Sequence, residues 1–197
     1  MSSNQPIGIF DSGFGGLTVA RAIIDLLPSE DIVYYGDTSR YPYGPQPLEE
    51  VKSYSQQISD YLIAEHDVKM IVIACNTASA AAEGDLRNST EIPIVGVITP
   101  GAQAVAEVSS TKKIGVIGTV GTINSQAYDN AIKGISPENI ELVSVACPGF
   151  VEFVERGEFE GEQVRILADR LLAPVIQADV DALLLGCTHY PYLARAI

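Results

Sequence analysis

Two cysteines in this chain of 197 residues stand in matching surroundings that suit proton transfer. Cys75 directly follows the apolar run 70–74, and Cys187 follows the run 182–185 after one glycine. A polar pair follows each thiol: Asn76 with Thr77, and Thr188 with His189. The start of a helix lowers the pKa of a thiol towards neutrality, which makes both the thiol and the thiolate accessible. We therefore expect acid and base chemistry at these cysteines, against the simpler alternative that both are buried apolar side chains.

The surroundings of the two cysteines belong to a longer internal repeat. Residues 67–77 can be placed over residues 179–189 without a gap, and residues 7–12 over residues 114–119. Two cysteines at corresponding positions of a repeat weigh against a purely structural role for either. The repeat predicts two related halves. A Pro-Gly turn signal in residues 98–101 places the boundary between a first domain, 1–98, and a second, 99–197.

The elements that must position these residues are short apolar runs separated by segments with helical spacing, of which 17–27 and 51–64 are the clearest. The runs are Ile7–Phe10, Ile32–Tyr35, Met70–Ala74, Ile94–Ile98, Ile114–Ile117, Leu142–Val145 and Ala182–Leu185. This alternation is typical of parallel α/β proteins. We predict an α/β fold of two similar doubly wound domains with mainly parallel sheets and an active-site cleft between them.

Ligands of open α/β sheets bind beyond the carboxyl ends of the strands, where the two cysteines stand. The same rule selects Asp11, Ser12 and Thr119. A carboxylate such as Asp11 after a buried strand is costly without a partner or ligand, although a helix-capping role is an alternative. The turn-rich loop 41–45 is a candidate for lining the same site or a plain surface turn. The glycines of residues 13–16 lack the third glycine of the dinucleotide fingerprint, so the sequence gives no reason to expect NAD or ATP.

The composition excludes several classes of function. Only 12 Lys and Arg stand against 25 Asp and Glu, so nucleic acid and anionic membranes are poor partners. The three cysteines form no C-x-x-C pair and no Cys/His cluster with zinc spacing, which argues against a metal site and a disulfide framework. No signal peptide and no apolar run of spanning length is present, so we expect a cytoplasmic protein. An acidic ligand would have to be held by helix N-termini and backbone amides.

Five motifs together resemble those of bacterial glutamate racemase, a member of the aspartate/glutamate racemase family. They are residues 8–18, 41–44, 74–80, 118–122 and 185–191, and they span nearly the whole chain in the family's order. The resemblance implies interconversion of L- and D-glutamate, supply of D-glutamate for peptidoglycan, no cofactor and no metal, and a homodimer. Family members normally continue for some tens of residues beyond the last motif. We therefore expect a strand and helix that return to the first domain to be missing here.

The resemblance also implies roles for individual residues. Cys75 and Cys187 would be the acid and the base, Asp11 would assist Cys75, and His189 would assist Cys187. A family glutamate corresponds to Glu155, with Glu152 as the alternative. Substrate would be bound by Asp11, Ser12, Tyr43, Gly44, Asn76, Thr77, Thr188 and His189.

The residue types support racemisation independently of the family resemblance. Inverting a carbon centre requires one group that removes the α-proton on one face and a second group that donates a proton on the other. Two thiols can act as the acid and the base for racemisation in either direction. Their titrations are coupled, because one must be a thiolate while the other is a thiol. Backbone amides, together with Asn76, Thr77, Thr119 and Thr188, would stabilise the carbanion.

Three alternatives remain at this stage. A racemase of aspartate or a related acid would use the same paired thiols. A non-catalytic protein that binds an acidic amino acid would need the anion-binding helix ends but not the thiols. A thiol-disulfide redox protein is disfavoured because the chain lacks the C-x-x-C motif.

Overall fold

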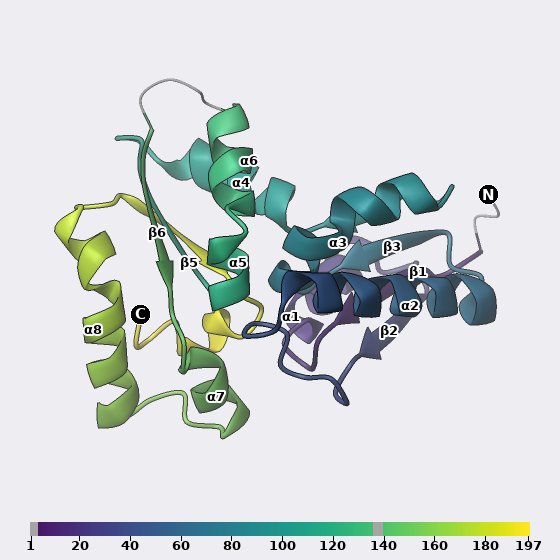
Figure 1. The fold of residues 1–197 in the computed structure, drawn as a ribbon, viewed down its shortest axis with the longest axis horizontal. Coiled ribbons are helices and arrows are strands. Elements are labelled where there is room, and N and C mark those ends of the chain that lie inside the picture. Colours follow the sequence, from purple (N-terminus) through teal and green to yellow (C-terminus); the bar gives the residue numbers. More distant parts are fainter. Residues whose placement is uncertain (1–3, 136–139) are drawn as a thin grey trace. The chain divides into compact units, whose positions relative to one another are not determined.

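The structure is a computed structural model that describes residues 4–135 and 140–197. The chain divides into two compact units, one ending at Val97 and the other beginning at Ile98 (Figure 1). Each unit is a parallel sheet with helices on both faces, so the predicted α/β class and the mainly parallel sheets are confirmed. All seven apolar runs that the sequence predicts as strands contain a strand.

The first unit has a sheet of four parallel strands in the order β2-β1-β3-β4. Alternate side chains of the central strands face opposite helices. Phe10, Ile71 and Ile73 pack with the α2 and α3 helices, and Ile9 and Val72 pack with α1. The elements of the first unit are β1 (Ile7–Asp11), α1 (Leu17–Leu26), β2 (Ile32–Gly36), α2 (Leu48–His66), β3 (Met70–Ile73), α3 (Asn76–Ser89) and β4 (Ile94–Gly96).

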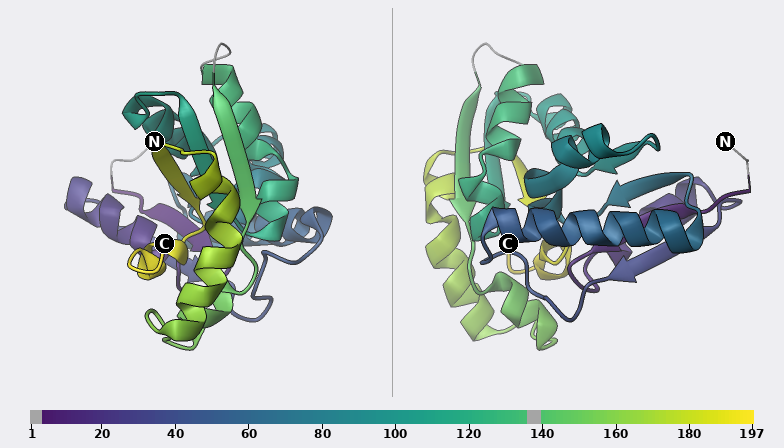
Figure 2. Two further views of the ribbon diagram at one scale, coloured as in Figure 1. Left: turned by 90° about the vertical axis from the view of Figure 1, so that its left-hand side faces the viewer. Right: turned by 45° about the vertical axis from the view of Figure 1, so that its right-hand side comes forward.

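The second unit has a sheet of three parallel strands in the order β6-β5-β7. Helices α7 and α8 share one apolar cluster with Ile117 of β5, and α8 runs beside β6 (Figure 2). Helix α4 packs on β7 and on α6. The elements are α4 (Ile98–Val108), β5 (Lys113–Gly118), α5 (Val120–Asn124), α6 (Ala127–Ile135), β6 (Glu141–Ala146), α7 (Phe150–Glu155), α8 (Glu162–Gln177), β7 (Ala182–Gly186) and the 3-10 helix η1 (Tyr190–Leu193).

The internal repeat of the sequence is visible in the strand register. Gly8 of β1 pairs with Ile71 of β3, and Gly115 of β5 pairs with Leu183 of β7, which are equivalent positions in the repeat. An added Cβ would lie 3.1 Å from Val68 at Gly8, and 3.3 Å from Val180, the equivalent valine, at Gly115. The two aspartates that open the repeated segments, at positions 67 and 179, both have positive φ angles, 49° and 52°. The two halves therefore share their backbone geometry as well as their residues.

The secondary structure of residues 98–101 differs from the prediction. Ile98 was expected to end a strand and Pro100-Gly101 to form a turn, but all four residues form the first turn of α4. Proline is tolerated there because the first amides of a helix have no intrahelical acceptor. Among the described residues, no helix is both long and apolar enough to cross a membrane.

Candidate active site

The first half of the candidate site is built where β1 and β3 end side by side. The two strands are paired in parallel, so Asp11, the last residue of β1, and Cys75, two residues after β3, are brought to the same edge of the sheet. Both residues are buried. The Asp11 carboxylate accepts a hydrogen bond of 3.0 Å from the Gly13 amide. The Cys75 thiol lies 3.9 Å from the Ser12 hydroxyl, so the adjacent strand ends place a carboxylate, a hydroxyl and a thiol together.

Cys75 also caps α3. Its sulfur accepts a hydrogen bond of 3.5 Å from the Ala78 amide. The expected lowering of its pKa is nevertheless wrong, because burial and then the charge of Asp11 raise the pKa of Cys75 to about 12. The hydrogen bonds from Ala78 and Ser12 act in the opposite direction and are outweighed. Burial and the charge of Asp11 therefore favour the thiol form of Cys75 over the thiolate at neutral pH.

A loop between β2 and α2 contributes Tyr43 and Gly44. Tyr43 is fully buried in the same apolar cluster as Cys75, and Gly44 beside it is half-buried. The Tyr43 hydroxyl donates a hydrogen bond to the Asp37 carboxylate. Sequence reasoning did not select Asp37. Its position offers a signal, because Asp37 stands two residues after the predicted strand 32–35 and directly after β2 as the structure has it.

The second half of the candidate site lies at the carboxyl end of β7. Cys187 follows this strand directly, and its sulfur lies 4.0 Å from Nδ1 of His189. The other ring nitrogen of His189, Nε2, lies 2.9 Å from Oε1 of Glu155. Thr188 Oγ1 lies 3.4 Å from Nδ1 of the same imidazole. The structure thus places a thiol, an imidazole and a carboxylate next to one another, and Glu155, the first of the two predicted glutamates, is the one in contact.

The remaining predicted residues fall into the same two groups. Asn76 and Thr77 are buried in the first turn of α3, beside Cys75. Thr119 follows β5, the strand next to β7, and its hydroxyl caps α5 by accepting from the Thr122 amide at 3.3 Å. Each unit therefore gathers a thiol, an ionisable partner and helix-terminal polar groups at its strand ends. Such N-terminal helix turns favour bound anions.

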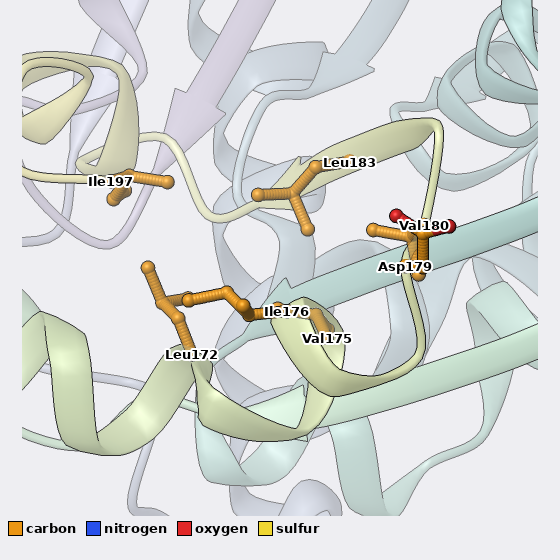
Figure 3. A pocket seen from close by; sticks show the side chains of 7 residues that line it. All are labelled: Leu172, Val175, Ile176, Asp179, Val180, Leu183 and Ile197. Atoms are coloured by element: carbon orange, nitrogen blue, oxygen red, sulfur yellow. The ribbon is translucent and has the colours of Figure 1, made fainter.

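A separate hollow in the second unit does not offer this chemistry. It lies between α8, the turn before β7 and the residue Ile197 (Figure 3). Asp179 is the one charged residue among its seven lining residues, and the others are Leu172, Val175, Ile176, Val180, Leu183 and Ile197. This apolar surface is at the amino end of β7, away from Cys187. Within residues 4–135 and 140–197, no group of three or more His, Cys, Asp or Glu side chains is arranged to hold a metal ion.

The fold and the two half-sites define an α/β protein of two related units, each of which presents a thiol with an ionisable neighbour at a strand end. Comparison with known sequences agrees with this class. The family model of Asp/Glu/Hydantoin racemases matches residues 8–197. Glutamate racemase of a Parafrankia species is 51% identical over 195 residues, which cover 99% of this chain and 70% of the relative.

Comparison with solved structures gives the same result. A glutamate racemase isoform from Bacillus anthracis superposes with a TM-score of 0.95 at 43% identity, covering 100% of this chain and 73% of the other. Glutamate racemase from Francisella tularensis, solved in complex with D-glutamate, superposes with a TM-score of 0.92 at 41% identity, covering 98% and 72%. The chain belongs to the Asp/Glu/Hydantoin racemase family, and these similar proteins are glutamate racemases.

Proposed function

We propose that this chain interconverts L- and D-glutamate, using Cys75 and Cys187 as the two proton-transfer groups. The observation that carries the proposal is the placement of one thiol at the equivalent strand end of each half of the repeat. Sequence identities of about half to glutamate racemases support glutamate as the substrate. Family membership connects the product D-glutamate to peptidoglycan synthesis in the cytoplasm, and the resemblance favours a homodimer.

The proposed reaction moves two protons and no other atoms. A thiolate removes the proton from the α-carbon on one face, and its sulfur becomes a thiol. The electron pair stays on the α-carbon and its carboxylate until the opposite thiol donates its proton to the other face and becomes a thiolate. The reaction therefore leaves the enzyme with its two protonation states exchanged, ready for the opposite enantiomer.

The two thiols have different assistants in this mechanism. Cys75 has a carboxylate neighbour, Asp11, whose charge favours the protonated thiol and which is suited to accept a proton from it. Cys187 has His189, whose imidazole is held through Nε2 by Glu155. A positioned imidazole is the side chain most often used to exchange protons near neutral pH. Asp11 and His189 are therefore proposed to return each thiol to the form that the next turnover needs.

The acidic substrate is proposed to be bound by polar groups at helix starts. Ser12, Asn76 and Thr77 stand beside Cys75, and Thr119 and Thr188 stand at the strand ends of the second unit. Amides of a first helical turn lack intrahelical acceptors and favour carboxylates. The same donors would stabilise the charge that develops on the α-carboxylate when the proton leaves. The chain's net charge of −13 makes such local donors necessary.

The proposal is tested by separating proton exchange from inversion in D2O. Wild type should incorporate deuterium at the α-carbon of both enantiomers by NMR and should invert both by circular dichroism. Cys75→Ser and Cys187→Ser should each lose inversion, and any residual exchange should be confined to one enantiomer, a different one for each variant. Inversion that survives in either variant would exclude the two-thiol mechanism.

Two further measurements address the alternatives. L-aspartate run beside L-glutamate separates glutamate racemisation from that of a related acid. A non-catalytic binding protein would bind glutamate without any exchange at the α-carbon. Both cysteine variants would then bind glutamate more weakly than wild type does. Sedimentation of the purified protein tests the proposed homodimer.

A further inference from the structure

The loop that carries Tyr43 and Gly44 is organised around a buried carboxylate that the proposed mechanism does not use. Asp37 directly follows β2 and is 2% exposed. Its carboxylate accepts hydrogen bonds from the Tyr43 hydroxyl and, at 3.1 Å, from the Ser39 hydroxyl. It also forms an ion pair with Arg40, whose Nε lies 2.6 Å away. All three partners belong to the loop itself, so a single side chain fixes the loop at three points.

The backbone of Asp37 is also paired with the strand end that presents Asp11. The Asp37 amide donates to the Asp11 carbonyl at 2.9 Å, continuing the pairing of β2 with β1. Just before it, an added Cβ at Gly36 would lie 2.8 Å from the Gly13 carbonyl oxygen, so the loops that follow β1 and β2 are in close contact. Asp37 therefore joins two segments of the candidate site.

Arg40 supplies the opposite charge and anchors the loop to α2. Its guanidinium donates to the Gln57 side chain at 2.9 Å and lies 4.5 Å from the centre of the Tyr54 ring. A buried carboxylate without a cation would be costly in itself and would repel an acidic substrate. The Asp37–Arg40 pair gives a polar anchor in which each charge is offset by the other.

Tyr43 connects the Asp37–Arg40 pair to the apolar cluster that contains Cys75. Its ring is 1% exposed and packs in the same cluster as Phe10 and Cys75. Burial, the hydrogen bond to Asp37 and the charge of that carboxylate all raise the pKa of Tyr43, which keeps the phenol a hydrogen-bond donor. The backbone at Gly44 follows this fixed ring directly, so its position depends on the hydrogen bond to Asp37.

We propose that Asp37, together with Arg40, is a positioning residue that holds the Tyr43–Gly44 segment in the geometry that binds a carboxylate of the substrate. The inference rests on the proposed function, because it assumes that this segment binds glutamate. Asp37 is not proposed to exchange a proton with the substrate. Its loss should therefore weaken binding of glutamate much more than it slows the chemical step.

The first test measures the loop without any reaction. In the ligand-free protein, Asp37→Ala should raise the hydrogen exchange of the non-proline amides within residues 40–46 by about tenfold, because the loop loses its three-point anchor, while the amides of residues 55–62 in α2 stay protected. Asp37→Asn should give a smaller change, because its amide oxygen still accepts from Tyr43. Unchanged exchange in residues 40–46 of Asp37→Ala would overturn the proposal.

The second test separates KM from kcat. Asp37→Ala should raise the KM for L- and D-glutamate about tenfold and leave kcat within about twofold. Tyr43→Phe removes the other partner of the same hydrogen bond, so the double variant should be no worse than Asp37→Ala alone. Effects that multiply in the double variant, or a kcat that falls with an unchanged KM, would contradict the positioning role.

Asp181→Ala is the matched control. Asp181 also joins several groups through one carboxylate, since it accepts from the Ser109 hydroxyl at 2.6 Å and the Thr111 amide at 2.6 Å, but it is exposed and lies at the amino end of β7. This variant should lower stability and leave both KM values unchanged, and a raised KM would show that general loosening explains the Asp37 result. If wild type does not racemise glutamate, the proposed function fails, and the exchange of residues 40–46 still decides whether Asp37 orders the loop.

Discussion

A methyl group added at Gly16 tests whether the packing behind Asp11 sets the geometry of the first half-site. Gly16 precedes α1 with an ordinary φ of −63°, so alanine is acceptable to the backbone and only space opposes it. The new Cβ would lie 2.5 Å from the Cβ of Asp11, 2.8 Å from the Tyr34 hydroxyl and 3.0 Å from the Cβ of Ala74. Carbon atoms in contact prefer about 3.5–4.0 Å, so the neighbours must move by about 1 Å.

That displacement has a predictable size in two assays. Overpacking of a filled interior costs about 1–3 kcal/mol, so urea denaturation of Gly16→Ala should show a loss in this range. The Tyr34 hydroxyl, which donates to the Gly13 carbonyl at 2.7 Å, would be pushed together with Asp11. Misplacing a reacting group by about 1 Å can reduce the rate about a hundredfold, so kcat/KM for glutamate should fall by up to that factor.

Gly84→Ala provides the control for this experiment. Gly84 lies inside α3, and an added Cβ there meets no atom within 4 Å. Alanine is the better helix former, so this variant should gain about 0.5–1 kcal/mol and keep its kinetics. If Gly16→Ala were as stable and as active as wild type, the close packing around Asp11 would not be what positions it.

Three further predictions concern the second unit. Glu155→Ala removes the carboxylate that holds His189 and should lower kcat/KM about tenfold by polarimetry, with Glu155→Gln closer to wild type. Gly186→Ala should lower stability and activity together in denaturation and rate assays, because the new Cβ would lie 2.9 Å from the Ile117 carbonyl and 3.0 Å from the Tyr128 ring. Burial raises the pKa of Cys147 from 9.0 to about 12. The unfolded thiol therefore ionises first, so stability falls as pH rises above 9, and Cys147→Ala should lose about 1 kcal/mol less than wild type between pH 8 and 10 in urea titrations.

The strand positions could be predicted from sequence because parallel strands buried on both faces are continuous apolar runs. The same pattern located Asp11, Cys75 and Cys187, since the first two directly follow such a run and Cys187 follows one after a single glycine. The repeat could also be recognised, because Gly8 and Gly115 recur at equivalent positions, and at both an added Cβ would press on an equivalent valine, Val68 or Val180. These features depend on local sequence and on strand order, and both are encoded in residue spacing.

Features that depend on the balance of opposing effects could not be read from the sequence. The helix start favours a thiolate at Cys75, but burial and Asp11 have the larger effect on its pKa, and neither is visible in a motif. Proline at position 100 is compatible with a turn or with a first helical turn, and the structure has the helix. Asp37 was overlooked because its partners, Arg40 and Tyr43, become recognisable as partners only when the loop is folded.

The thiols occupy equivalent positions in a duplicated architecture, but their neighbours are not equivalent. A carboxylate acts on Cys75, whereas an imidazole backed by a carboxylate stands beside Cys187. Enantiomers have equal free energies in water, so the ratio of kcat/KM between the two directions must equal unity for any racemase, however unlike its two bases. For the proposed reaction, the chemical asymmetry of the halves is therefore hidden from equilibrium. In the steady-state constants of the wild type it can appear only as differences in kcat between the two enantiomers that equal differences in KM compensate.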